Sequence, residues 1–290
     1  MAFFEYKPNS TIFYYTDEAG FRGIIASKRL WLSDTALLND PRELHLGMKL
    51  LSEAIDAYED DAVYGVSNRD LQRFLLDFHN FRQQSTCYAC CFSSKGDELP
   101  MWRSYADNGA GVSIGIRPTA LGAMPGRVQL VRYAEEDITA YFQQVVLKVA
   151  QNLGEIGSVE RASTAGEALA SISCVKHRSW DYEREVRIIY SQRHVRPSTN
   201  LDITKYTAEH DDGELVEWSE PLQREGKNGL VRYFSFPFGK RWRGQVEAKG
   251  AIETVTIGSN SQLRRSEVDD ILRSNGFEGF RIQQSDCEFR

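Results

Sequence analysis

The sequence has no apolar run long enough to cross a membrane, and Met1 to Lys7 lack the basic segment followed by an apolar one that marks a secretory leader. Internal repeats and low-complexity tracts are also missing. Basic residues do not predominate, because 35 Lys and Arg stand against 41 Asp and Glu, for a formal net charge of -6. This balance excludes a broadly basic nucleic-acid coat, although a local basic patch such as 240–243 stays open. We expect a cytoplasmic protein with no membrane partner.

Cysteine and histidine are scarce, with five of each among 290 residues. An odd and small number of cysteines does not make a disulfide framework in a chain of this length, and it fits a reducing compartment. Cys87 and Cys90 have the spacing of half a zinc site, but no second Cys or His pair follows at ligand spacing. Their segment is instead typical of a strand buried on both faces. We therefore predict buried thiols and no metal site.

The sequence contains enough apolar residues, 41% of the total, to bury a large core in a single domain over residues 1–290. Runs of apolar, β-branched and aromatic residues predict strands. These runs are residues 11–15, 30–32, 87–93, 112–116, 128–133, 252–257 and a last strand through Phe280 and Ile282. With the helices below, they predict the α+β class, a mixed and mostly antiparallel sheet carrying a helical lobe.

Two helical insertions are predicted between the strands. Residues 40–83 form a helical pair, which begins with Asp40 as cap, Pro41 at the first helical position and Glu43 at the capping-box position. The second insertion covers about 135–173, where apolar residues recur at helical spacing.

Three shorter features complete the predicted organisation. Thr16 or Asp17 is expected to cap a short helix after the first strand. The polar residues 197–228 are expected to form a mobile loop or lid. Near the end of the chain, a helix is expected to close at Asn275-Gly276.

The most informative segment is Trp180–Tyr190, where charged residues alternate at the beginning of an apolar strand. Because side chains on a strand repeat every two residues, Glu183, Glu185 and Arg187 are expected to share one face. Two like charges on one face favour perturbed pKa values, which make a carboxylate useful in catalysis. The alternative is a solvated face with Glu/Arg pairs and no function.

A resemblance to a known family rests on motifs along most of the chain. These are Phe13-Tyr14-Tyr15-Thr16, Gly23-Ile24-Ile25, Leu30-Trp31-Leu32-Ser33, Leu38-Asn39-Asp40-Pro41-x-Glu43, Cys91-Phe92-Ser93, Met101-Trp102-x-x-Tyr105, Gly109-x-Gly111-Val112-x-Ile114-Gly115, Trp180-x-x-Glu183-x-Glu185-x-Arg187 and Ser285-x-x-x-x-Arg290. In this order they resemble the bacterial DUF2971 family. That family name describes no activity.

A looser resemblance implies a chemistry. An early aromatic-x-Thr strand, here Tyr14-Tyr15-Thr16, followed much later by a strand-borne Glu is similar to the ADP-ribosyltransferase fold, which includes DNA-modifying toxins. The resemblance implies that NAD is the substrate, with no metal, and that Glu185 leads catalysis while Glu183 helps. It implies a macromolecular acceptor, protein or nucleic acid, and a role as a toxin or in antiviral defence.

The same resemblance implies contacts with the dinucleotide. Tyr14 and Thr16 would fix the ribose. Trp102 and Tyr105 would offer flat aromatic faces to a base. Arg103 or Arg187 would bind the pyrophosphate with a bidentate guanidinium. The structural alternatives are that Trp102 and Tyr105 pack in the core, that Thr16 and Glu43 are helix caps, and that Arg187 only neutralises Glu183.

Two other functions stay open. The first is a non-catalytic nucleotide or nucleic-acid sensor on the same scaffold. The second is a nuclease or nucleotide hydrolase that holds Mg²⁺ with Asp40, Glu43, Glu183 and Glu185. Each function requires that the first strand and the acidic strand meet in one cleft.

Overall fold

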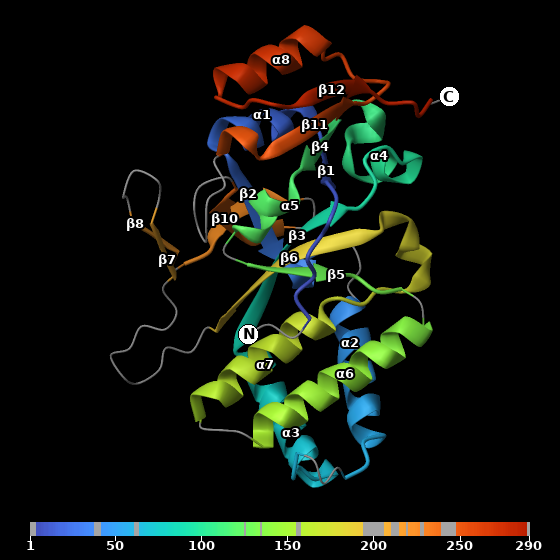
Figure 1. The fold of residues 1–290 in the computed structure, drawn as a ribbon, viewed down its shortest axis with the longest axis vertical. Helices are drawn as coiled ribbons and strands as arrows, with labels where there is room; N and C mark the ends of the chain where they lie inside the picture. Colours follow the sequence, from blue (N-terminus) through green and yellow to red (C-terminus); the bar gives the residue numbers. More distant parts are fainter. Residues whose placement is uncertain are drawn as a thin grey trace.

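The structure is a computed structural model with side chains. The residues that it describes are 4–37, 42–60, 64–124, 126–133, 135–154, 158–193, 206–209, 215–218, 220–226, 229–238 and 248–288. Figure 1 shows two regions, a large sheet with short helices around it and a helical lobe that lies below the sheet. Among the described helices, none combines the length and the apolar character needed to span a membrane.

The main sheet has ten strands and is antiparallel except for one parallel pair. Its path runs β12-β11-β4-β1-β3-β2-β10-β9, and β6 adds to β3 and β5 to β6. The strands are β1 (Ile12–Thr16), β2 (Arg29–Asp34), β3 (Ser85–Ser93), β4 (Val112–Ile116), β5 (Arg127–Leu130), β6 (Glu185–Arg193), β9 (Leu222–Gly226), β10 (Gly229–Pro237), β11 (Ile252–Ile257) and β12 (Arg281–Gln284). A separate hairpin contains β7 (Tyr206–Glu209) and β8 (Leu215–Trp218). The predicted α+β class and mostly antiparallel sheet are confirmed.

Four helices form the lobe, and their apolar stripes face one another. They are α2 (Glu43–Asp56), α3 (Asn68–Gln83), α6 (Glu135–Gly154) and α7 (Ser158–Ile172). Ser67 begins α3 with a capping box to Asp70, which satisfies two of the helix's first N–H groups. Both predicted helical insertions are therefore present. Asn39, Asp40 and Pro41, at the predicted start of α2, lie outside the described residues.

The remaining helices surround the sheet. They are α1 (Glu18–Ser27), α4 (Leu99–Tyr105), α5 (Pro118–Gly122), α8 (Arg265–Ser274) and four short 3₁₀ helices at Thr35–Leu37, Asp107–Gly109, Arg178–Glu183 and Ala248–Gly250. Asp17, one of the two predicted caps, begins α1, where its side chain accepts a hydrogen bond from the Gly20 N–H. Of the two predicted candidates the cap is thus Asp17, because Thr16 is still the last residue of β1.

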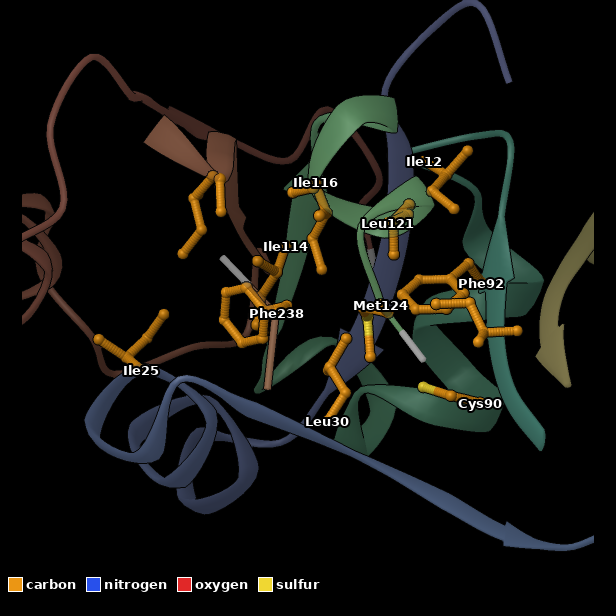
Figure 2. Close-up of a cluster of buried hydrophobic side chains, with 14 of the residues drawn as sticks. Ile12, Ile25, Leu30, Cys90, Phe92, Ile114, Ile116, Leu121, Met124 and Phe238 are labelled. Atoms are coloured by element: carbon orange, nitrogen blue, oxygen red, sulfur yellow. The ribbon is translucent and has the colours of Figure 1, made fainter. Parts of the chain in front are cut away.

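The strands β3 and β6 form a wall between two hydrophobic cores. Alternate residues of β3, such as Cys90 and Phe92, point into the sheet core, which Figure 2 shows with Ile12 and Leu30 from neighbouring strands. Residues of the opposite parity, such as Cys87, pack against the helical lobe. The expectation that this strand is buried on both faces, with buried thiols at Cys87 and Cys90, is confirmed.

The sequence-based prediction for residues 197–228 needs correction. The described parts of this segment contain β7, β8 and β9 in place of an irregular loop. The strand β10, which follows it, was not predicted although Phe234 and Phe236 alternate with polar residues and both are buried. Strand pairing therefore overrides the polar composition of this region.

A pair of glycine substitutions tests how closely the lobe packs. A Cβ on Gly47 of α2 would lie 2.1 Å from the carbonyl oxygen of Ile172, at the end of α7, whereas a Cβ on Gly166 would meet nothing within 4 Å. We expect Gly47→Ala to lower the free energy of unfolding by about 1–3 kcal/mol through overpacking. Gly166→Ala should raise it by up to ~1 kcal/mol, because alanine favours the helix. Urea unfolding measures both, and an equally stable Gly47→Ala variant would contradict this contact.

Candidate functional site

The sheet opens between β1 and β2. Along one edge of β3, β1 pairs through Phe13 with Ser93, while β2 pairs through Ser33 with Ala89. The strands separate because β1 follows β4 along its whole length and β2 follows β10. The edge of β3 from Cys90 to Phe92 therefore has no ladder partner in either strand. A cavity of about 310 Å³ lies at this opening.

The cavity has aromatic walls and a charged floor. Aromatic residues from β1, β2, β3 and α4 make its walls: Phe13, Tyr14, Tyr15, Trp31, Phe92 and Tyr105. The charged residues on its surface are Lys176, Glu183, Glu185 and Arg224. Its volume lies at the lower end of the range of small-molecule sites, and a mostly apolar wall with a few convergent polar groups is typical of such sites.

A buried ion cluster forms the floor. Glu43, Glu183 and Glu185 converge on the side chains of Lys176 and Arg187, and all five are buried. The Lys176 ammonium lies 2.6 Å from Glu183, 2.8 Å from Glu185 and 3.1 Å from Glu43. With every group ionised, three carboxylates and two cations leave one net negative charge below the cavity.

Arg187 is 0% exposed and uses all its donors inside the cluster. Its guanidinium donates two hydrogen bonds to Glu185, two to Glu43 and one to the carbonyl oxygen of Ser173, at 2.5–3.0 Å. Five bonds match the five N–H groups of arginine. Arg187, one of the two residues predicted to bind the pyrophosphate, therefore has no donor left for a ligand.

A backbone turn brings the two acids together. Glu183 ends the 3₁₀ helix Arg178–Glu183, and Glu185 begins β6. Arg184 between them adopts the left-handed conformation, with φ 44° and ψ 52°. This conformation is costly for a residue with a Cβ and is concentrated at functional sites. Glu183 was expected within the strand, but it reaches the same side as Glu185 through this turn.

The two acids have opposite pKa shifts. Burial alone would raise the pKa of Glu185, but Arg187 and Lys176 outweigh it and hold that pKa at about 2. Burial raises the pKa of Glu183 above its ordinary value, and Lys176 offsets only part of the effect. Burial lowers the pKa of Lys176, but the carboxylates of Glu185 and Glu43 raise it overall. Glu185 is therefore ionised at neutral pH, while Glu183 takes up a proton more readily than an ordinary glutamate does.

Two tyrosines, Tyr14 and Tyr105, line the same cavity as Glu183 and Glu185. The Tyr105 hydroxyl donates a hydrogen bond to Glu183 Oε1. Tyr14 lines the cavity and packs edge-on against Phe92, with ring centroids 5.7 Å apart. Burial raises the pKa of Tyr14 well above its ordinary value, so it stays a neutral phenol. Its hydroxyl forms no hydrogen bond with any residue that the structure describes, which leaves a donor for a ligand.

Three other predicted contacts lie away from the cavity. Trp102 is 0% exposed, and its indole N–H donates to Asp97 at 2.6 Å, so it is a core residue and offers no face to a base. Arg103 is exposed on α4, outside the cavity wall, and Thr16 does not line the cavity either. Thus the structure brings Tyr14, Tyr105, Glu183 and Glu185 together but leaves Trp102, Arg103 and Thr16 out.

Other residues of the site were missed or assigned another role. Lys176 follows α7 in no recognisable motif, and Arg224 lies in the segment predicted as a loop. Glu43 was predicted as a helix cap, but its carboxylate binds Arg187 and Lys176. For the metal-dependent alternative, Asp40 lies outside the described residues, and the three glutamates turn their oxygens toward cations.

The fold and site together define an α+β protein whose split antiparallel sheet holds an aromatic cavity above a buried acid–cation cluster. Residues 101–188 match the model of the family described as "Protein of unknown function (DUF2971)", which supports the resemblance found in the sequence motifs. The matched residues run from α4 to β6 and include Tyr105, Lys176, Glu183 and Glu185. The comparisons with curated proteins and with solved structures found no match.

Glutamine substitutions should separate the roles of the two acids in stability. Glu185→Gln breaks the buried ion pairs of Glu185 with Arg187 and Lys176 and should lower the free energy of unfolding by about 3–5 kcal/mol. Glu183→Gln removes a carboxylate whose charge burial disfavours, and should therefore lower the free energy of unfolding by clearly less than Glu185→Gln does. Guanidinium unfolding at neutral pH measures both, and equal losses would contradict the assignment.

Acid should weaken the wild-type protein through Glu185. Its folded pKa of about 2 lies below the ordinary 4.5, so its contribution is complete above pH ~4.5 and is lost as the pH falls toward 2. A difference of about 2.5 pKa units corresponds to roughly 3 kcal/mol. Unfolding measured between pH 6 and 3 should show this decline, and Glu185→Gln, where it still folds, should lack that part of it.

Proposed function

We propose that this protein is a cytoplasmic ADP-ribosyltransferase, which cleaves the bond between ribose and nicotinamide in NAD and passes ADP-ribose to a macromolecule. One observation carries the proposal. The cavity joins Tyr14 of the first strand to the Glu183 and Glu185 pair, about 170 residues later, as the resemblance to that fold requires. A role as a toxin or antiviral defence effector follows from the same resemblance.

The charge arrangement fits the reaction. When the C1′–N bond breaks, its electron pair leaves with nicotinamide and positive charge develops on the ribose. The net negative cluster stabilises that charge in a site shielded from water, where electrostatic effects are strongest. Glu185 contributes to this stabilisation through its negative charge and not through direct contact, because Arg187 and Lys176 occupy its oxygens.

Glu183 is better placed than Glu185 to touch the reactants. Each of its oxygens accepts one hydrogen bond, from Tyr105 and from Lys176, and keeps a further lone pair. Its raised pKa suits a base that accepts the proton of the incoming nucleophile while that nucleophile bonds to C1′. Tyr14 supplies a neutral donor to a ribose oxygen. The sequence-based expectation gave Glu185 the leading role, and the geometry favours Glu183 for direct contact.

Nicotinamide release from NAD tests the proposal. Glu183→Gln should reduce the rate at least ~100-fold, the usual contribution of a general base. Because the base must be ionised, the wild-type rate should rise with pH through the titration of Glu183, and the variant should lack this rise. Tyr14→Phe removes one hydrogen bond and should raise KM by up to ~10-fold. A folded wild-type chain that neither binds nor cleaves NAD would sink the proposal.

Tyr88→Phe provides the matched control. Tyr88 lies on β3, is buried in the sheet core and does not line the cavity. Losing its hydroxyl should leave NAD cleavage unchanged. Equal effects of Tyr14→Phe and Tyr88→Phe would show a general loss of stability in place of a lost ligand contact.

A non-catalytic nucleotide sensor is the second candidate. The observation that favours it is that Lys176 and Arg187 already compensate two of the three negative charges on the floor. A sensor would bind NAD or a related nucleotide without releasing nicotinamide, and Glu183→Gln would not alter that behaviour. Calorimetry together with the release assay separates the two functions.

A further inference from the structure

The outer face of β2, β10 and β9 carries a group of aromatic and basic side chains. The strand registers place Ser235 opposite Trp31, Tyr233 opposite Ser33 and Leu222, and Val231 opposite Arg224. Residues that face each other across an antiparallel pair lie on the same side of the sheet. We call this surface the Trp31 face; its main residues are Arg29, Trp31, Ser33, Leu222, Arg224 and Tyr233.

Large apolar side chains on this face are open to solvent. Trp31 is 48% exposed and Leu222 is 52% exposed. The Trp31 ring lies against Tyr233, with centroids 4.6 Å apart and planes 39° apart. The Arg224 guanidinium lies 5.5 Å from the centre of the Trp31 ring. The face therefore offers a flat aromatic platform with a cation beside it.

The charge on this face is opposite to that of the whole chain. Its strands place Arg29 and Arg224 there and no acidic residue, although the formal net charge of the protein is -6. Arg29 donates to the side chain and the carbonyl of Ser235. Arg224 donates to Ser33, and its buried Nε has no partner in the part of the chain that is described. The face thus attracts anions.

The Trp31 face is continuous with the cavity. Trp31, Ser33, Arg224 and Val231 belong to the face and also line the cavity. A ligand on the face would thus reach the mouth of the site that contains Glu183.

We propose that the Trp31 face binds single-stranded nucleic acid, with an unpaired base stacked on Trp31 and a neighbouring phosphate bound by Arg224. Aromatic platforms beside basic groups bind single strands because every base has a π-face and every nucleotide a phosphate. A duplex keeps its bases stacked within itself and gains nothing from Trp31. An acidic peptide would satisfy the arginines but not the aromatic pair.

The proposed binding of nucleic acid is an additional property that does not depend on NAD cleavage. A strand held there would present a nucleotide at the cavity mouth, where the transfer needs an acceptor, and this step alone rests on the proposed function. Binding is measured without NAD and nicotinamide release without nucleic acid. Failure of one therefore leaves the other test standing.

Fluorescence anisotropy with a labelled oligothymidylate of about 12 nucleotides tests the proposal on the full chain. We expect saturable binding that weakens with salt. Trp31→Ala should raise Kd about 5- to 100-fold, and Trp31→Phe should retain most of the affinity. Arg224→Ala should reduce the slope of log Kd against log salt by about 0.7, the value for one phosphate contact with a single strand.

Arg281→Ala and Leu76→Ala are the controls, since both residues are exposed and lie far from this face in the fold, on β12 and α3. They should bind as the wild type does, and thermal unfolding should confirm that every variant is folded. The proposal is overturned by absence of binding, by wild-type affinity in Trp31→Ala, by a duplex that binds more tightly than the single strand, or by polyglutamate that competes as well as the oligonucleotide.

Discussion

Arg187 has no exposed surface, yet its charge connects the two regions of the molecule. It lies on β6 of the sheet, and it binds Glu43 of α2 and the carbonyl oxygen of Ser173 just after α7. Removing it would leave Glu43 and Glu185 as buried carboxylates with Lys176 as their remaining cation, which is far costlier than leaving an apolar group there. The orientation of the helical lobe against the sheet, and with it the floor of the cavity, therefore depends on this guanidinium.

The cavity itself results from a competition between strand pairings. β3 has one edge for β1 and β2, but β1 is held by β4 and β2 by β10. The two strands consequently contact β3 at its end and near its middle and leave Cys90–Phe92 open between them. The ion cluster closes this opening from the side of the lobe. An aromatic pocket with a charged floor thus requires no special loop, because sheet topology and one set of buried charges produce it.

The sequence predicted the features that a repeating pattern encodes. The helices α2, α3 and α6 have apolar stripes, and β3 and β4 are continuous apolar runs, so their positions followed directly. The charged segment was identified, but its burial was not. Glu185 and Arg187 alone are typical of a solvated strand, and their partners Glu43, on α2, and Lys176, just after α7, lie outside the segment. Lys176 has no local signal. Trp102 was misassigned because an aromatic residue in a motif looks the same whether it faces a ligand or Asp97.

The composition of the cluster argues for a function beyond stability. Apolar residues of similar volume commonly stabilise a core as well as a buried ion network does, since each charge loses its hydration on folding. Glu183 in particular has a raised pKa, so its ionised form is disfavoured by the fold that surrounds it. Arg184 beside it adopts a strained backbone conformation that orients this acid toward Lys176 and the cavity. A buried charge, a strained neighbouring backbone and an adjacent cavity thus coincide at Glu183. A chemical role requires this combination, whereas a role in packing does not.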